Sequence, residues 1–348
     1  MIDVPSVLLE LGPVFRSTEA SRAGLSPKVV RRAISAGLVR RLAPGCFTSE
    51  VVWSAAPPTA RQVLLAQVAS WQRPWAVVSH HTAAAVHGLP APPHPPEWVA
   101  LTTNREICTA DGGISRLEPA ALPAEAVVTS SGLQVTGVAR TVIDCLRTLP
   151  LADGVAIADA AVARRMVSLS ALSRERAFQK GWPHVSDVDC GLWLLDPVRE
   201  GWFESVSFTQ LWIAGVRVPE HQVTVLDDRE RFVARVDGLW REEGVVGEAD
   251  GESKYLDGLD PDDVTARSVA RKLVAEKRRE DRLHDLGLDV VRWSPTEPVR
   301  VRADRVRATW TVARRPFRGR LVSHEGSRHA WRASVDEPVL HPRTRFRR

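Results

Sequence analysis

The sequence predicts a multidomain α+β protein, and three observations lead to this fold class. The chain has 348 residues, more than a single ordinary core usually holds. Near the N-terminus, helices separated by a glycine-containing turn precede two short strands, which is the order of a winged helix-turn-helix. After residue 201 the pattern favours helix, three strands, helix and strand. We therefore expect a winged helix-turn-helix at 1–56, a mixed α/β middle region at 57–200, an αβββαβ domain at 201–300 and a basic, disordered tail at 317–348.

Composition limits the class of protein further. Hydrophobic residues make up 44% of the chain, which indicates a globular protein. No run of about 18 or more apolar residues appears and the N-terminus lacks a basic leader, so we expect a cytoplasmic protein without a membrane span. Four scattered cysteines without a CxxC pair fit reduced thiols. A net charge of +5 gives mild support for a polyanion partner, although the arginine-rich composition also fits a high-GC coding bias.

The candidate DNA-binding helix is the segment SPKVVRRAISAG. Ser26 is the expected N-cap, Pro27 stands at the first helical position and Gly37 ends the helix. Cations suited to phosphate and groove contacts lie on this helix and on the wing that follows it: Lys28, Arg31, Arg32, Arg40 and Arg41. The alternative is a helical protein-interaction domain with a solvated basic face. A winged helix on palindromic DNA would favour a homodimer.

The middle region contains two motifs whose residue types occur in metal-binding or catalytic sites. The run SHHTAAAVHGL at 79–89 predicts a short helix of small residues. Its adjacent histidines, His80 and His81, do not share a helix face, which favours packing over metal binding. Arg140 and Asp144 are four residues apart on a further helix and predict a helix-surface ion pair, not a catalytic pair.

Three carboxylates are expected to converge on a hairpin in the segment 235–255. If Trp240 pairs with Val245 across the turn, Asp237 lies opposite Glu248, and alternation puts Asp250 on the face of Glu248. Opposed like charges destabilise a sheet, and their oxygen ligands suit Mg²⁺ or Mn²⁺. The alternative is a set of solvated acids on an exposed hairpin.

Two families resemble parts of the chain. Residues 201–295 resemble the very-short-patch-repair endonuclease-like branch of the PD-(D/E)xK nucleases, and the resemblance is carried by Glu204-Ser205, RVDGLW at 235–240, GEADGESKY at 247–255, EKRRE at 276–280 and VVRW at 290–293. The N-terminal half resembles the AbiEi-like antitoxin domain of actinobacterial proteins. Its marks are PGCF at 44–47, the run at 79–89 and RTVID at 140–144.

The nuclease resemblance implies metal-assisted phosphodiester hydrolysis. Asp237, Glu248 and the carbonyl of Ala249 would hold Mg²⁺, and Glu204 would add an outer ligand or orient a water molecule. The lysine usual in that family is Asp250 here, which would instead be a further metal ligand. Lys254 or Lys277 would then supply the missing cation.

The sequence leaves alternatives open for two further arginines and for the function. Arg279 and Arg292 suit either DNA-phosphate contact or ion pairing with Glu276 or Glu280. The first functional reading is a DNA-binding, Mg²⁺-dependent endonuclease in a defence or toxin-antitoxin context. The alternative is a non-catalytic, antitoxin-like transcriptional regulator with a degenerate nuclease fold. A third reading is an interaction protein whose alanine-rich middle docks a toxin.

Overall fold

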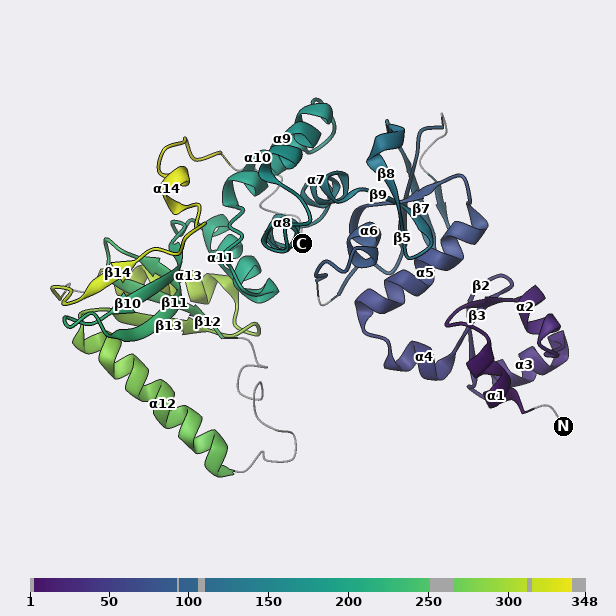
Figure 1. Ribbon diagram of the computed structural model, residues 1–348, viewed down its shortest axis with the longest axis horizontal. Coiled ribbons are helices and arrows are strands. Elements are labelled where there is room, and N and C mark those ends of the chain that lie inside the picture. Colours follow the sequence, from purple (N-terminus) through teal and green to yellow (C-terminus); the bar gives the residue numbers. More distant parts are fainter. Residues whose placement is uncertain (1–2, 93, 106–109, 251–265, 312–314, 340–348) are drawn as a thin grey trace. The chain divides into compact units, whose positions relative to one another are not determined.

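The computed structural model describes residues 3–92, 94–105, 110–250, 266–311 and 315–339 (Figure 1). The chain forms two compact units. Unit 1 combines Met1–Leu149 with Val167–Gln179, and unit 2 combines Pro150–Met166 with Lys180–Arg348. The chain therefore crosses between the units three times. No helix among the described residues is long and apolar enough to span a membrane.

Unit 1 begins with the expected helix-turn-helix and wing. A three-stranded antiparallel sheet of order β1-β3-β2 accompanies the helices, with the bounds α1 (Val4–Glu10), β1 (Phe15–Arg16), α2 (Ser17–Arg22), α3 (Pro27–Ser35), β2 (Val39–Ala43), β3 (Cys46–Ser49) and α4 (Glu50–Ala55). Phe15, Leu25, Val30 and Phe47 form the core between the helices and the wing. Burial of these side chains fixes α3 against the sheet and leaves its other face to solvent.

The rest of unit 1 is a six-stranded sheet with helices. Its strand order is β6-β7-β5-β4-β9-β8. The bounds are α5 (Pro58–Gln72), β4 (Val77–Val78), α6 (His80–Val86), β5 (Val99–Thr103), β6 (Ala110–Gly112), β7 (Ser115–Pro119), β8 (Val127–Ser130), β9 (Leu133–Thr136), α7 (Val138–Thr148) and α9 (Leu169–Phe178). The small residues of α6 allow it to pack against both α5 and α7.

Unit 2 has the predicted order of helix, three strands, helix and strand. Its sheet has the order β13-β12-β11-β10-β14, in which β12 and β13 run parallel. The bounds are α8 (Leu151–Ala163), α10 (Val185–Leu194), α11 (Trp202–Ile213), β10 (Glu220–Leu226), β11 (Phe232–Trp240), β12 (Val245–Ala249), α12 (Ala266–Asp285), β13 (Asp289–Trp293), α13 (Val299–Trp310), β14 (Arg320–Val322) and α14 (His329–Arg332). The helix α8, expected in the middle region, packs against α11 in this unit.

The two faces of this sheet carry separate core clusters. One cluster joins α11 and α13 to the sheet and includes Phe208, Trp240, Val245 and Trp293. The other joins α12 to the sheet and includes Val246. Because Val245 and Val246 are neighbours on β12, the clusters lie on opposite faces, and Glu248 shares the α12 face with Val246.

Two expectations from the sequence change here. The expected disorder from residue 317 is corrected, because β14 pairs with β10 and α14 follows; residues 340–348 lie outside the described residues. Arg140 and Asp144, expected on a helix surface, are fully buried, with side-chain exposures of 1% and 0%. The thiols of Cys46, Cys145 and Cys190 are free and buried, which agrees with structural cysteines.

Candidate functional sites

The helix α3 presents a basic face to solvent. It begins where the Val29 N–H donates to the Ser26 hydroxyl at 3.4 Å, as the capping pattern predicted. At 100° per residue, the exposed side chains of Lys28, Arg31 and Arg32 fall on one arc, opposite the buried core positions of the helix. No hydrogen bond or ion pair within the described part of the chain holds these three side chains. The arc is therefore available to a polyanion.

The two wing arginines lie on opposite sides of β2, because successive strand residues alternate. Arg40 donates to Glu50 through Nε at 2.9 Å and through its terminal nitrogen at 2.8 Å, and it stacks on Trp53 at 5.5 Å. Arg41 is exposed, and its Nε lies 3.4 Å from the carbonyl oxygen of Ala43. Of the two predicted DNA contacts on the wing, Arg41 has the available guanidinium.

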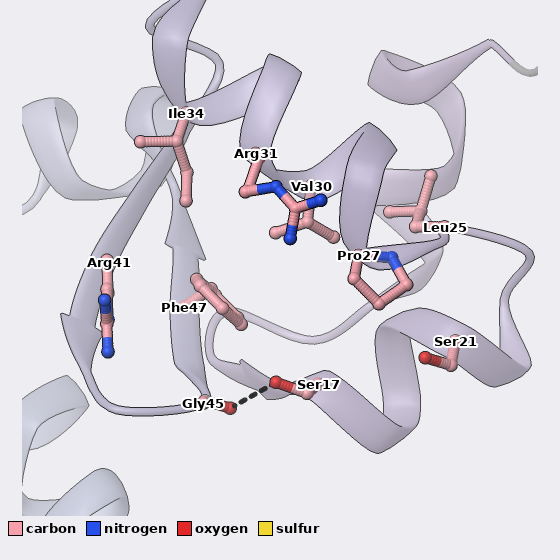
Figure 2. Close-up of a pocket in the computed structure, with 10 residues that line it drawn as sticks. All are labelled: Ser17, Ser21, Leu25, Pro27, Val30, Arg31, Ile34, Arg41, Gly45 and Phe47. Atoms are coloured by element: carbon pink, nitrogen blue, oxygen red, sulfur yellow. Dashed lines mark hydrogen bonds between the residues drawn. The ribbon is translucent and has the colours of Figure 1, made fainter.

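A hollow of about 270 Å³ separates α3 from the wing (Figure 2). The view in Figure 2 shows Arg31 on the helix and Arg41 on the strand, to either side of Phe47. The Ser17 hydroxyl donates to the Gly45 carbonyl at 3.4 Å and so ties α2 to the tip of the wing. The lining combines these two cations with two serines, a glycine and several apolar side chains: Ser17, Ser21, Leu25, Pro27, Val30, Arg31, Ile34, Arg41, Gly45 and Phe47.

The hairpin carboxylates lie in the register that the sequence predicted. Trp240 pairs with Val245, and Gly238 pairs with Gly247, which brings Asp237 beside the β12 residues that follow. The Ala249 N–H donates to Oδ2 of Asp237 at 3.0 Å. This hydrogen bond therefore holds the Asp237 side chain against the end of β12.

Glu204 of α11 joins this group from the preceding helix. The residue is 7% exposed, and its carboxyl group accepts hydrogen bonds from Gln222 Nε2 at 3.0 Å and from the Glu200 N–H at 2.9 Å. Burial, and then repulsion from Asp237, raise the pKa of Glu204 to about 8, so it is protonated at neutral pH. Gln222 has φ +54°, a conformation that few non-glycine residues adopt, and it stands between the paired positions opposite Asp237.

Arginines, which the sequence left unassigned, neutralise Glu248. Its Oε2 accepts from Arg279 at 2.5 Å and from Nε of Arg292 at 3.0 Å. Burial raises the pKa of Glu248, and both arginines oppose this effect. Nε of Arg292 also lies 3.8 Å from Asp250, so Glu248 and Asp250 face the same guanidinium, as alternation predicted.

The same arginines pair with acids of α12. Arg279 contacts Glu276 at 2.7 Å, and Arg292 contacts Glu276 at 2.6 Å and Glu280 at 2.8 Å. Of the two alternatives left open by the sequence, ion pairing is therefore the observed one. The partner that the sequence did not indicate is Glu248.

A divalent ion does not fit this donor set as it is arranged. Two guanidinium groups already donate to the Glu248 oxygen that would bind the ion. Within the described residues, no group of three or more His, Cys, Asp and Glu side chains could hold a metal ion. Lys254 lies outside the described residues, and Lys277 is exposed on α12.

The two motifs of the middle region converge on one buried cluster in unit 1. Asp144 accepts from Arg140 Nε at 2.7 Å, from Arg147 at 3.3 Å and from Gln179 Nε2 at 3.1 Å. Burial works against ionisation of Asp144, but nearby His80 and the arginines outweigh it and lower the pKa of the carboxyl. Arg140 and Asp144, which were expected to pair on a helix surface, therefore form a buried ion pair inside unit 1.

The histidines of the 79–89 run serve packing, as the spacing favoured. His80 Nδ1 lies 2.8 Å from the Ser79 hydroxyl, and His81 Nε2 lies 2.9 Å from the Trp98 carbonyl. Burial lowers the pKa of His81 to about 4, so it is neutral at physiological pH. Ser79 precedes α6 as its N-cap residue, but its hydroxyl bonds the imidazole and not the helix backbone.

Comparison with known proteins supports one part of the resemblance. Residues 4–48 match the family model described as a transcriptional regulator, AbiEi antitoxin. This match agrees with the helix-turn-helix and wing, and it does not extend to the nuclease-like region. No curated protein matches the chain. Among solved structures, the RV2827C protein from Mycobacterium tuberculosis is similar at 14% identity and a TM-score of 0.36, over 55% of this chain and 74% of that one. A likeness at that TM-score carries no inference about fold or function.

Proposed function

We propose that the chain binds duplex DNA through α3 and the wing and acts as an antitoxin-type transcriptional regulator. The observation that carries this proposal is the exposed arc of Lys28, Arg31 and Arg32, with Arg41 across the hollow. Phosphate contacts by such cations position a recognition helix on the major groove. The family match at residues 4–48 supports the same assignment. A toxin protein is the expected partner in that setting, and a homodimer is expected on palindromic DNA.

The test is the binding of a fluorescent duplex taken from the DNA upstream of the protein's own coding region. Arg31→Ala and Arg41→Ala should each weaken binding by about tenfold and reduce the slope of log affinity against log salt by about one. Arg40→Ala is the matched control, because Arg40 is adjacent to Arg41 but donates to Glu50. Equal losses of DNA affinity in all three variants would show that Arg41 contributes no more to binding than Arg40 does. Absence of binding by the wild type would contradict the proposal.

A second candidate function is a Mg²⁺- or Mn²⁺-dependent endonuclease in unit 2. The observation in its favour is the buried Glu204 carboxyl beside Asp237, held by Gln222 in a strained backbone conformation. Asp237, Glu248 and Asp250 would be the metal ligands, and binding would require Arg279 and Arg292 to leave Glu248. Asp250 stands where the resembling family has lysine, which favours the regulator.

Cleavage of supercoiled plasmid separates the two functions. Wild-type protein is incubated with Mg²⁺ or Mn²⁺ beside Asp237→Ala and Glu248→Ala. Metal-dependent nicking that both substitutions abolish would support the nuclease. Intact plasmid under both ions, with DNA binding retained, would leave the regulator as the function.

A further inference from the structure

The C-terminal segment at 327–339 docks on unit 2 almost entirely through polar contacts. Between residues 323 and 339, Arg332 is the one buried side chain, at 6% exposure. Nε of Arg332 donates to the Trp193 carbonyl at 3.2 Å, and a terminal nitrogen of Arg328 donates to the Leu192 carbonyl at 2.7 Å. A segment that buries no apolar side chain gains little from the hydrophobic effect, so its attachment depends on these bonds and on the hydrogen bond that Trp212 Nε1 donates to Glu337.

The receiving group is Asp196, which is fully buried. Arg332 donates to its Oδ2 at 2.5 Å, and the backbone N–H of Arg328 lies 3.3 Å from its Oδ1. A buried carboxylate without its cation is strongly unfavourable, so this ion pair links the position of the segment to the charge balance of the buried Asp196 site.

Asp196 starts a buried chain of hydrogen bonds that ends at β11. The Asp196 N–H donates to Asp159 at 2.7 Å, and Arg199 donates to the other Asp159 oxygen at 3.0 Å. Arg199 also donates to His221 Nε2 from Nε at 3.1 Å and from a terminal nitrogen at 3.0 Å. With Nε2 occupied as an acceptor, Nδ1 of His221 carries the hydrogen and donates to the Asp237 carbonyl at 3.1 Å.

The chemistry of each link supports a continuous path. Burial, and then Arg199, hold the pKa of His221 well below its usual range, so the imidazole is neutral and its tautomer is fixed. Asp159, Asp196, Arg199 and His221 are each at most 4% exposed. In such surroundings hydrogen-bonded groups polarise one another, and the loss of one member disturbs the next.

We propose that residues 327–339 form a releasable strap whose docking through Arg332 sets the position of β11 at Asp237. When the strap is seated, Asp196, Asp159, Arg199 and His221 are held in one arrangement, and the Asp237 carbonyl accepts the final bond. When the strap dissociates, the Asp196 carboxylate loses its cation, and the hydrogen bonds that run from Asp196 to the Asp237 carbonyl rearrange. The strap is therefore a conformational control on the Asp237 region, whether or not unit 2 cuts DNA.

Amide hydrogen exchange of the full-length chain tests the coupling. In Arg332→Ala, amides of the strap should exchange close to the rate of an unstructured chain, and amides of β11 around Asp237 should exchange about tenfold faster than in the wild type. Arg320→Ala is the control, because Arg320 lies on β14 just before the strap but pairs with exposed Glu230. It should leave both regions unchanged.

A strap that is released while β11 keeps its wild-type exchange would overturn the coupling. A strap that stays protected in Arg332→Ala would overturn the docking. If circular dichroism shows that Arg332→Ala is unfolded, Arg332→Lys replaces it. Lysine keeps a cation at Asp196 but loses the planar donor set, so both regions should then exchange at rates between those of the wild type and an unstructured chain. Wild-type exchange of both regions in Arg332→Lys would equally contradict the proposal.

Discussion

Two buried carboxyl groups of unit 2, those of Glu204 and Glu248, have different neighbours. Glu204 has an amide and a backbone N–H as donors and an acid beside it, so it holds its proton. Glu248 has two guanidinium donors and is matched by their charge. Burial raises the pKa of both carboxyls, and the neighbouring acid at Glu204 adds to this effect, whereas the guanidinium groups at Glu248 oppose it.

Stability should depend on pH through Glu204. The folded carboxyl titrates near pH 8, above its ordinary value of 4.5, so the folded state binds more protons between these values. The stabilisation is complete below about pH 4.5 and is lost as the pH rises through about 8, at roughly 1.4 kcal/mol per pH unit. Glu204→Gln removes this proton, so its free energy of unfolding should fall less than that of the wild type between pH 5 and about 8.

Urea unfolding of the two proteins at pH 5, 7 and about 9 measures the difference. The comparison cancels the other titrating groups, which both proteins share. Parallel pH profiles would show that Glu204 ionises normally in the fold.

At the same scale, the sequence predicted the register of the hairpin but not the partners of its acids. The hairpin turn and the period of two placed Asp237 on β11 and Glu248 on β12 in this register, and Asp250 directly follows β12. Arg279 is 31 residues from Glu248 on α12, and Arg292 reaches Glu248 only through the parallel pairing of β12 with β13. Such pairing depends on a long crossover, which local periodicity does not encode. No local signal marked Gln222.

At the scale of elements, glycines in β11 and β12 set how closely aromatic side chains approach the sheet. A Cβ atom at Gly238 would lie 2.6 Å from the Phe208 ring of α11. One at Gly247 would lie 2.8 Å from both Trp240 and Trp293. Both strands therefore use glycine where a ring lies against the backbone.

Gly247→Ala should lower the free energy of unfolding by about 1–3 kcal/mol, since two large rings must shift. Gly201→Ala is the control, because a Cβ there meets nothing within 4 Å and its φ is −134°. Thermal unfolding followed by near-UV circular dichroism measures both. A Gly247→Ala protein as stable as Gly201→Ala would show that the rings repack without cost.

The order of the helices and strands was predictable from the sequence, but the unit to which each of them belongs was not. The runs of apolar residues and the turn at 241–244 were sufficient for α11, β10, β11, β12, α12 and β13. The apolar run of α8 indicates a buried helix but not which helix it packs against, so its place beside α11 was missed. Strand β14 is three residues long, too short for a periodic signal.

At the scale of the whole molecule, unit 1 is built from two stretches of sequence that are separated by a stretch belonging to unit 2. Residues 150–166 belong to unit 2, and 167–179 return to unit 1. The return brings Gln179 to Asp144 at 3.1 Å and to Glu175 at 3.0 Å. Each unit is therefore discontinuous in sequence, and the residue composition near the boundaries did not predict this.

Gln179→Ala should destabilise unit 1 by about 1–3 kcal/mol, because it removes a donor from a buried carboxylate. The exposed neighbour supplies the control, Lys180→Ala, which should unfold like the wild type. Urea unfolding gives both midpoints. If the two variants unfold together, the returning segment does not stabilise unit 1.

The discontinuity also sets an order of events while the chain is being made. Synthesis proceeds from the N-terminus, so Asp144 exists before Gln179, 35 residues later, and the hydrogen bond between them forms only after that segment has been made. Asp196 waits longer, for Arg332, which follows 136 residues after it. The nascent chain therefore completes these two buried acid clusters at different times, because Asp144 has Arg140 and Arg147 close by in the sequence, whereas Asp196 lacks its cation until Arg332 has been synthesised.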